Sequence, residues 1–245
     1  MKNKVFRKSF LLLFLLASSI VSFVSCSGCS KKSASMAMVP EDATYVVHFD
    51  MGRIWDKGDL DHADRYTFIK LLRQEIKDED SEVAKIFDEL LKDPNSCGLN
   101  LKGDVLGFMS ESMKTEMCIA FQVNNSEKLK DFIKDMSKRL DVDVDFSKES
   151  NYNLAYIDNL ESAICWDKVR AYFYPAYSEK DANKYADRLM SIDEKNSMSQ
   201  NDNFNQFMKG QHDLGFFLNS EKAMGTMSRR ELEEFGAAAD KLKGT

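Results

Sequence analysis

The residues with the densest potential for chemistry lie between Asp56 and Asp64, where four carboxylates and one imidazole occur within nine positions. Such groups bind divalent cations or transfer protons in hydrolases. Read as a calcium loop from Asp56, however, the segment has Asp61 in place of the turn glycine and Thr67 in place of the bidentate glutamate. We therefore expect solvent-facing acids at a helix start and no metal site. A hydrolase that uses the carboxylates near His62 is the enzymatic alternative.

The other two histidines have no partner at useful spacing in the sequence. His48 falls within a strand-like run and His212 precedes another, so we expect structural or surface roles for both. The sequence contains no Gly-x-Ser-x-Gly elbow, His-Glu-x-x-His pair, Walker loop or Gly-x-Gly-x-x-Gly turn. These absences argue against the common hydrolases, proteases, nucleotidases and dehydrogenases. We predict no cofactor and favour a protein that is not an enzyme.

The chain begins with a secretory signal. Four basic residues occur within the first eight positions, and the apolar segment Phe10–Val24 follows. This segment is shorter than the roughly 20 residues that a membrane-spanning helix needs, and small residues follow it. We predict that residues 1–25 form a signal peptide that is cleaved.

A cysteine ends this segment and offers a lipid attachment site. The tetrapeptide Phe-Val-Ser-Cys that ends at Cys26 resembles the bacterial lipobox, in which a small residue precedes a cysteine that is acylated on sulfur. Cys29, which follows Gly28, is the alternative attachment site. Buried acyl chains contribute about 0.8 kcal/mol per CH₂, so several chains hold a protein stably on a bilayer. We predict a membrane-anchored lipoprotein of the cell envelope. The lack of acidic residues just after Cys26 resembles the Bacteroidota lipoproteins of the outer membrane that face the periplasm.

The charge balance limits the partners. The whole chain has 34 basic and 40 acidic residues, and removing the four basic residues before Cys26 leaves 30 against 40, a formal charge of −10. Such a surface repels phosphate backbones and anionic lipids. We therefore exclude nucleic acid as a partner and expect the acyl lipid to make the bilayer contact. A protein or another envelope component is the further partner that we expect.

Three cysteines remain in the mature chain. Cys118 and Cys165 lie in apolar strand-like runs, where cysteine packs as a small hydrophobic residue, and Cys97 lies elsewhere. Three thiols leave at least one unpaired. We expect buried thiols, with one disulfide as the open alternative.

The domain organisation follows from composition and periodicity. Residues 26–38 are rich in Ser, Lys, Ala and Gly, which predicts a tether, and residues 39–245 form the domain. The last predicted helix, which starts at Ser228 and Glu231, has an apolar face without a partner, so a chain truncated at its C-terminal end is expected. Runs of β-branched and aromatic residues predict strands at Thr44–Asp50, Val105–Met109, Met117–Val123, Asn153–Ile157, Leu160–Trp166, Val169–Tyr174 and Leu214–Leu218.

Amphipathic helices lie between these strands. We predict Ser81 and Ser126 as the N-caps of two helices, and the capping box that Ser178 forms with Asp181 as the start of a third. Residues 196–205 read as a polar loop. Turn-prone Asp-containing pairs between the short strands after residue 150 suit an antiparallel meander. The sequence therefore predicts an α+β fold with a largely antiparallel sheet covered by amphipathic helices.

Aromatic residues gather near the third quarter of the chain. Trp166, Tyr172, Phe173, Tyr174 and Tyr177 lie within twelve positions. They suit either the core of a sheet or a ligand groove, and half-buried sheet faces select the same side chains. We expect the core.

Two short phrases resemble a known family. Val39–Val47, with its Pro-acidic-Ala phrase, and Cys97–Leu101, with Gly followed by alternating apolar and Asn residues, resemble segments of the Bacteroidota lipoproteins of domain of unknown function 4836. Members of that family are usually longer, so the resemblance implies that this chain is an N-terminal portion. It implies location and fold class but no activity.

Three functions remain open at this point. The first is an envelope lipoprotein that acts as a binding or structural module through its sheet or helix surface. The second is an enzyme of unrecognised type, and the third is a truncated fragment without an independent function. A broad apolar patch favours binding, whereas a cleft of converging titratable groups favours an enzyme.

Overall fold

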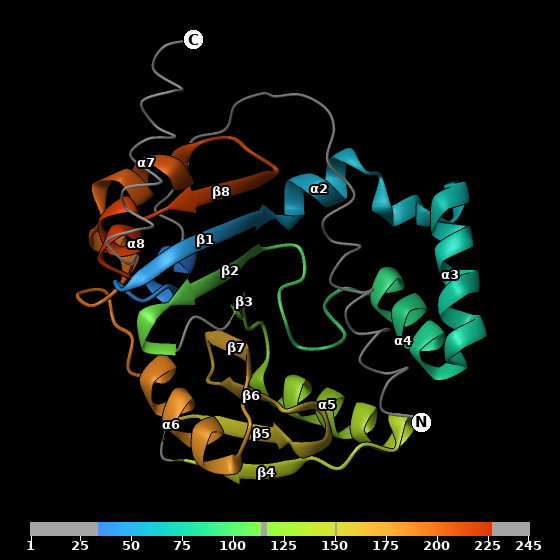
Figure 1. Cartoon of the computed structure of the whole chain (residues 1–245). Helices are drawn as coiled ribbons and strands as arrows, with labels where there is room; N and C mark the ends of the chain where they lie inside the picture. The colour runs from blue at the N-terminus through green and yellow to red at the C-terminus, as the bar shows by residue number, and fades with distance from the viewer. Residues whose placement is uncertain (1–33, 114–116, 150, 227–245) are drawn as a thin grey trace.

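Within residues 34–113, 117–149 and 151–226, which the computed structural model describes, the chain forms one antiparallel sheet of eight strands (Figure 1). The strand order is β4-β5-β6-β7-β3-β2-β1-β8. The predicted α+β class with a largely antiparallel sheet is therefore confirmed. The strands are β1 Ala43–Asp50, β2 Asp104–Ser110, β3 Met117–Gln122, β4 Asp145–Lys148, β5 Asn153–Ile157, β6 Ser162–Trp166, β7 Arg170–Pro175 and β8 Leu214–Leu218.

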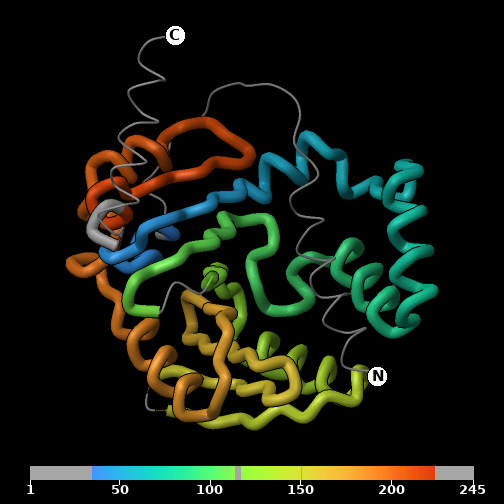
Figure 2. The backbone as a smooth tube through the Cα atoms, viewed as in Figure 1, coloured from blue at the N-terminus to red at the C-terminus, as the bar shows by residue number. Residues whose placement is uncertain are grey.

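The helices flank this sheet, and Figure 2 shows α3 and α4 as a pair at the side of the molecule opposite α6 and α7. None of the helices in the described part of the chain is long and apolar enough to cross a bilayer. The α-helices are α2 Met51–Lys57, α3 Thr67–Glu79, α4 Ser81–Lys92, α5 Ser126–Leu140, α6 Glu179–Met190, α7 Asp202–Lys209 and α8 Ser220–Thr226. The 3₁₀ turns are η1 Ala34–Met38, η2 Leu60–Arg65, η3 Glu111–Met113, η4 Asp158–Leu160 and η5 Met198–Gln200.

The two faces of the sheet differ in how they are covered. Side chains alternate between the faces along each strand. The core face carries Val46, Phe108 and Tyr172, and these side chains pack with residues of α6, α7 and η1 in the main hydrophobic cluster. The open face carries Val47 and Ile119, which remain partly exposed. Helix α5 covers the open face only at the end of the sheet that holds β5, β6 and β7.

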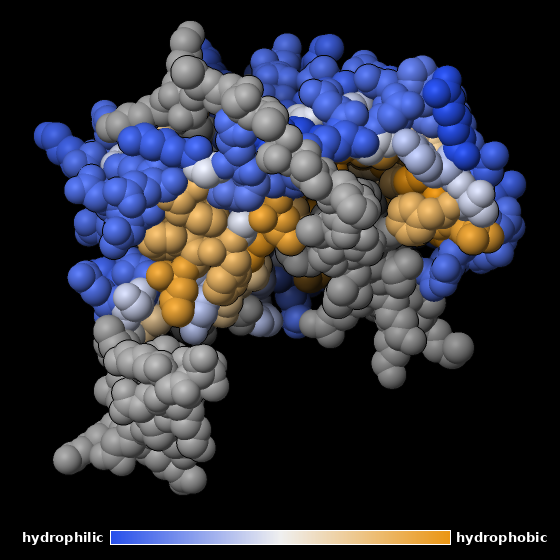
Figure 3. Space-filling model, turned by 90° about the horizontal axis from the view of Figure 1, so that it is seen from above, coloured by the Kyte–Doolittle hydropathy of each residue, from blue (hydrophilic) through white to orange (hydrophobic). Residues whose placement is uncertain are grey.

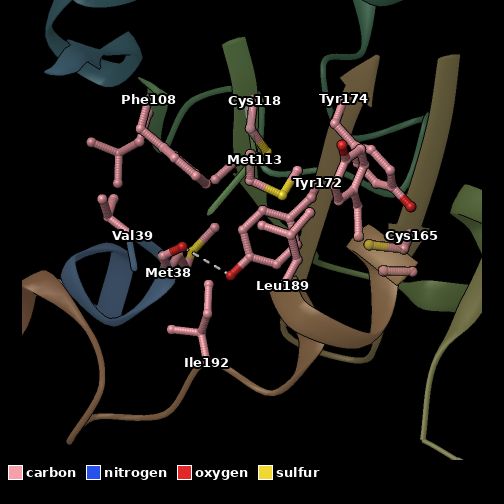
Figure 4. Packing of buried hydrophobic residues seen from close by; sticks show 14 of the residues in the cluster. Met38, Val39, Phe108, Met113, Cys118, Cys165, Tyr172, Tyr174, Leu189 and Ile192 are labelled. Carbon is pink, nitrogen blue, oxygen red and sulfur yellow. Dashed lines mark hydrogen bonds between the residues drawn. The ribbon is translucent and has the colours of Figure 1, made fainter. Parts of the chain in front are cut away.

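The core face is closed by large aromatic side chains and thiols (Figure 4). The Tyr172 hydroxyl donates a hydrogen bond of 2.9 Å to the carbonyl of Met38, which ties the first turn of the described chain to the sheet. Cys118 and Cys165 lie in this cluster, and Cys97 is buried as well. All three are free thiols, as predicted.

The structure corrects two local expectations. Residues 34–38, predicted as part of the tether, form η1, and Met36 and Met38 are buried in the core. Residues 196–205, predicted as a loop, contain η5 and the first half of α7. Helix α7 was hidden because most of its residues are polar and only Phe204 is buried.

Two predicted helix caps are shifted by one residue. Asp80 caps α4 in place of Ser81, and Asn125 caps α5 in place of Ser126. Each capping side chain accepts hydrogen bonds from backbone N–H groups of the first turn, which is the energetic role of the N-cap. At α6 the predicted cap is confirmed, since the Ser178 hydroxyl accepts from the N–H of Asp181. The helix predicted from Ser228 lies outside the described residues.

Gly98 fixes the entry into α5. Its φ of +81° lies in the left-handed region, and a Cβ there would lie 2.4 Å from the backbone N of Leu129. The Gly98 carbonyl also accepts from the N–H groups of Asn124 and Asn125. Only glycine combines this positive φ with the absence of a Cβ. The Cys-Gly phrase of the sequence therefore marks a close approach of two backbones.

Candidate functional site

An apolar pocket lies on the open face, between α4, α5 and the strands β5, β6 and β7. Its volume is about 250 Å³. The lining residues come from both helices, the chain after α5 and the sheet: Val83, Ile86, Phe132, Ile133, Met136, Ser137, Leu140, Val142, Val144, Ile157, Leu160, Ile164 and Phe173.

The lining offers almost no polar group to a ligand. Ser137 has the only hydroxyl among the lining side chains, and its Oγ donates to the carbonyl of Val142 at 2.8 Å. Ligand sites usually combine an apolar wall with a few polar groups that fix the orientation of the ligand. This pocket therefore suits a molecule, or a part of one, that is apolar throughout.

The sequence of α5 builds one wall. Leu129 and Ile133 pack with Trp166 and hold the helix against the small residues of the sheet. Phe132, Met136 and Leu140, spaced by four positions, share the neighbouring stripe and line the pocket. One helix thus serves as a cover of the core with one stripe and as a pocket wall with the next.

An ion-pair network joins α4 to α5 beside the pocket. The Arg139 guanidinium on α5 lies 2.8 Å from Glu89 and 3.3 Å from Glu82 on α4, and 3.4 Å from Asp135 on its own helix. The pKa of the Arg139 guanidinium is raised, and its hydrogen bond to Glu89 is the main cause. This network fixes the distance between the two helical walls.

Hydrophobic surface continues beyond the pocket along the open face. On β1, Tyr45, Val47 and Phe49 are partly exposed, and on β8 the side chain of Phe216 retains 61% of its exposure. Figure 3 shows hydrophobic residues gathered in separate areas with hydrophilic borders. Such a surface is typical of a binding site.

A chain of polar groups crosses the other side of the sheet at β1, β2 and β8. His48 Nε2 lies 2.9 Å from Asp104 Oδ1, and His48 Nδ1 lies 3.1 Å from His212 Nε2. The Ser35 hydroxyl donates to the other oxygen of Asp104 at 2.6 Å. When both imidazoles are neutral and Asp104 is ionised, His48 Nε2–H donates to Asp104 Oδ1. His48 Nδ1 then accepts from His212 Nε2–H. In a nucleophile–base pair the hydroxyl contacts the imidazole, whereas Ser35 contacts the carboxylate, so these contacts are not those of a Ser–His nucleophile pair.

His212, for which a structural or surface role was expected, is partly buried and has a packing role. Its ring stacks on Phe207 with centroids 4.6 Å apart. Burial lowers the pKa of His212, and the nearby His48 adds to this effect. Sequence spacing held no signal for this contact, because only the pairing of His48 with Gly215 across β1 and β8 brings the two histidines together.

The acidic segment 56–64 covers the end of α2 and most of η2; as expected for helix-start acids, Asp61 lies in the first turn of a helix, which is the 3₁₀ helix η2. Asp61 accepts from the Trp55 indole at 2.7 Å and from Lys102 at 3.1 Å, and these hydrogen bonds lower the pKa of Asp61. His62 lies 2.6 Å from Asp59. Among the described residues there is no group of three or more side chains able to hold a metal ion. The structure brings this segment into ion pairs rather than into a cleft.

The aromatic cluster of the sequence divides between the two faces. Tyr172 and Tyr174 are fully buried on the core face, and Trp166 is fully buried under α5 on the open face, so all three are core residues as expected. Phe173 lines the pocket from the opposite face of β7, and Tyr177 is exposed. Strict alternation along β7 is the sequence signal that separates Phe173 from its neighbours. The predicted lipid attachment residues Cys26 and Cys29 lie outside the described residues.

Comparison with known proteins adds a family. No curated protein matches the sequence. The crystal form III structure of TP0453 is similar to 75% of this chain at 11% identity and a TM-score of 0.42, and this chain covers 62% of that one. The model of the domain of unknown function DUF4836 matches residues 36–243. This match spans most of the sequence, so the chain belongs to the DUF4836 family.

Proposed function

We propose that this protein is a lipid-anchored binding module of the bacterial cell envelope, and that its pocket binds a single hydrocarbon chain. The observation that carries the ligand class is the pocket lining, where the one hydroxyl is already bonded within the chain. A peptide segment in the same place would bury backbone N–H and C=O groups without partners, at a cost of several kcal/mol. A hydrocarbon chain has no such groups.

The physics of the site predicts how affinity depends on the ligand. Each CH₂ group removed from water contributes about 0.8 kcal/mol. Affinity therefore increases with chain length until the pocket of about 250 Å³ is filled, and it depends little on the head group.

A fluorescent fatty acid provides the direct test. We expect cis-parinaric acid to bind the full chain saturably, and Met136→Lys to weaken this binding about tenfold or more because the variant places a charge among the apolar walls. Met109→Lys is the matched control, since Met109 is a partly exposed methionine of β2 that does not line the pocket.

Two results would contradict the proposed ligand. One is the absence of saturable binding to the wild-type chain. The other is an equal loss of affinity in Met136→Lys and Met109→Lys, which would place the probe on the exposed sheet surface instead of in the pocket.

The envelope location rests on the signal and the cysteines of the sequence. We expect Cys26→Ala to move the protein from the membrane fraction to the soluble fraction, while Cys29→Ala stays in the membrane fraction. Cell fractionation followed by immunoblotting measures both variants. If neither variant leaves the membrane fraction, the thioether anchor is wrong.

A further inference from the structure

Strand β8 leaves one edge of the sheet open in the described part of the chain. Its other edge bonds to β1, as the hydrogen bonds from Asp50 N–H to the Asp213 carbonyl and from Asn219 N–H to the Thr44 carbonyl show. In an antiparallel pair the residues that bond inward alternate with residues whose backbone points outward. The N–H and C=O groups of Leu214, Phe216 and Leu218 therefore point away from the sheet.

The sequence of β8 has none of the devices that usually protect an open edge. Such edges carry charged residues, proline or a bulge. Strand β8 reads Leu-Gly-Phe-Phe-Leu and pairs with β1 without a break in register. The opposite edge of the sheet, β4, has Asp145 and Lys148 at its ends. One edge is thus protected and the other is not.

We propose that β8 pairs antiparallel with β8 of a second copy of this chain, with a twofold axis at Phe216. The strand suits its own reverse, because this register places Leu214 of each copy opposite Leu218 of the other. Each copy then bonds all outward N–H and C=O groups of its three outward residues. The side chains of these residues lie on the open face, where Phe216 and Leu218 are 61% and 39% exposed.

The ends of the strand do not oppose this pairing. Asp213, just before β8, lies 2.7 Å from Lys57 and 3.0 Å from Arg53. These two cations compensate the Asp213 carboxylate, and Arg53 also lies 3.9 Å from Asp50, the acidic residue across from Asp213 on β1. An antiparallel partner brings its Glu221 toward this end, and no unpaired negative charge meets it there.

The symmetry of the pair agrees with a lipid anchor. An axis at Phe216 that joins two sheets edge to edge is perpendicular to the sheet, so the open faces of both copies lie on the same side. The first described residues, in η1, pack on the core face of each copy. Both copies therefore present η1 on the same side of the pair, which is compatible with attachment to one bilayer.

Light scattering on the full chain in detergent tests the assembly. We expect a dimer for the wild-type chain and a monomer for Phe216→Lys, because the new charges face each other across the axis. Phe146→Lys is the matched control, since Phe146 is a partly exposed phenylalanine on the protected edge strand β4. Circular dichroism checks that both variants fold.

Cysteine crosslinking tests the register. Residues opposite each other in such a pair have Cα atoms about 5.5 Å apart. With a short bismaleimide we expect Phe216→Cys to crosslink well above the level of the parent chain, and Leu214→Cys to remain at that level. The native thiols at positions 97, 118 and 165 are buried and react little.

Several outcomes would overturn the proposal. These are a monomeric wild-type chain, a dimer that persists in a folded Phe216→Lys, and crosslinking of Leu214→Cys as strong as that of Phe216→Cys. A complex with a different protein chain at β8, found by the same crosslinker in cells in place of the dimer, would also overturn it.

Discussion

Gly215 is the residue that allows His212 to reach His48. A Cβ at position 215 would lie 2.3 Å from Cδ2 and Nε2 of the His212 ring, and 2.7 Å from Cε2 of Phe207. The ring can approach the backbone of β8 this closely because glycine leaves the space free. The absence of one methyl group thus permits a hydrogen bond that connects β8 to Asp104 on β2.

Substitution of this glycine should therefore be costly. We expect Gly215→Ala to lower the free energy of unfolding by about 1–3 kcal/mol, the usual cost of overpacking. Gly107→Ala on β2 is the control, because its Cβ would meet the flexible Met117 Sδ at 3.3 Å and Val47 Cβ at 3.9 Å, an ordinary van der Waals distance. Chemical denaturation measures both variants, and an equal loss in the two would refute the role of the ring contact.

His212 also makes stability depend on pH. Its pKa in the folded chain is lower than the ordinary value of 6.5, mainly because of burial. Between these two pKa values the unfolded chain binds more protons, so the free energy of unfolding falls as the pH falls through about 6.5 toward the folded-state pKa. His48 and Arg53 lower this pKa further, while Asp50 and Asp213 oppose them.

The measurement is a set of urea denaturation curves between pH 5 and 8. We expect His212→Asn to flatten the decline of stability below neutral pH, and His62→Asn, at an exposed surface histidine, to keep the wild-type decline. If His212→Asn and the wild-type chain show parallel curves, the histidine pair does not control this titration.

At the scale of elements, the pocket depends on how α4 is held against α5. Both helices present apolar residues to the pocket, and only Arg139 in the described chain links them through ion pairs. Partly exposed ion pairs contribute about 0–1 kcal/mol to stability, so this network acts on the position of α4 more than on the global fold.

Loss of the network should free one helix without unfolding the chain. We expect Arg139→Ala to change the free energy of unfolding by less than about 1 kcal/mol, while amide hydrogens of α4 exchange faster. Lys85→Ala is the control, since Lys85 pairs with Glu82 within α4 itself. Hydrogen exchange with mass spectrometry separates the two, and unchanged exchange in Arg139→Ala would contradict the expected role.

Element type was predictable wherever the hydrophobic period was strong. The alternation in β3 and the apolar stripe of α5 both specify their elements directly. The caps Asp80 and Asn125 were missed because a serine follows each of them and is an equally good cap by type. Helix α7 was missed although it carries a helical signal, since Phe204, Phe207 and Met208 have the i, i+3, i+4 spacing of one helix face and Asn201 caps the first turn. The polar residues around them obscured this spacing, and the predicted loop ended at residue 205, before the stripe was complete.

At the scale of the whole molecule, the sequence predicted the sheet but not the uneven cover of its two faces. The runs of β1 and β3 predict strands, but they do not tell which face of the sheet the helices cover. The connections between the strands decide which face of the sheet each helix covers, and no local sequence pattern specifies these connections. The pocket arises from this arrangement, because residues of α4, α5 and β7 meet only in the folded chain. The N-terminal lipid signal that we predict, by contrast, rests on a pattern that is entirely local in sequence.

The order of the strands also has a consequence for biosynthesis. Strand β8 pairs with β1, so Tyr45 meets Leu218 only after nearly the whole described chain has been made. At about 5–20 residues per second, the ribosome needs roughly 10–35 seconds to add the intervening residues. During that time β1 can be protected on that side only by a chaperone or by delayed folding. Nascent chains that stop before Leu214 are therefore expected to aggregate through β1.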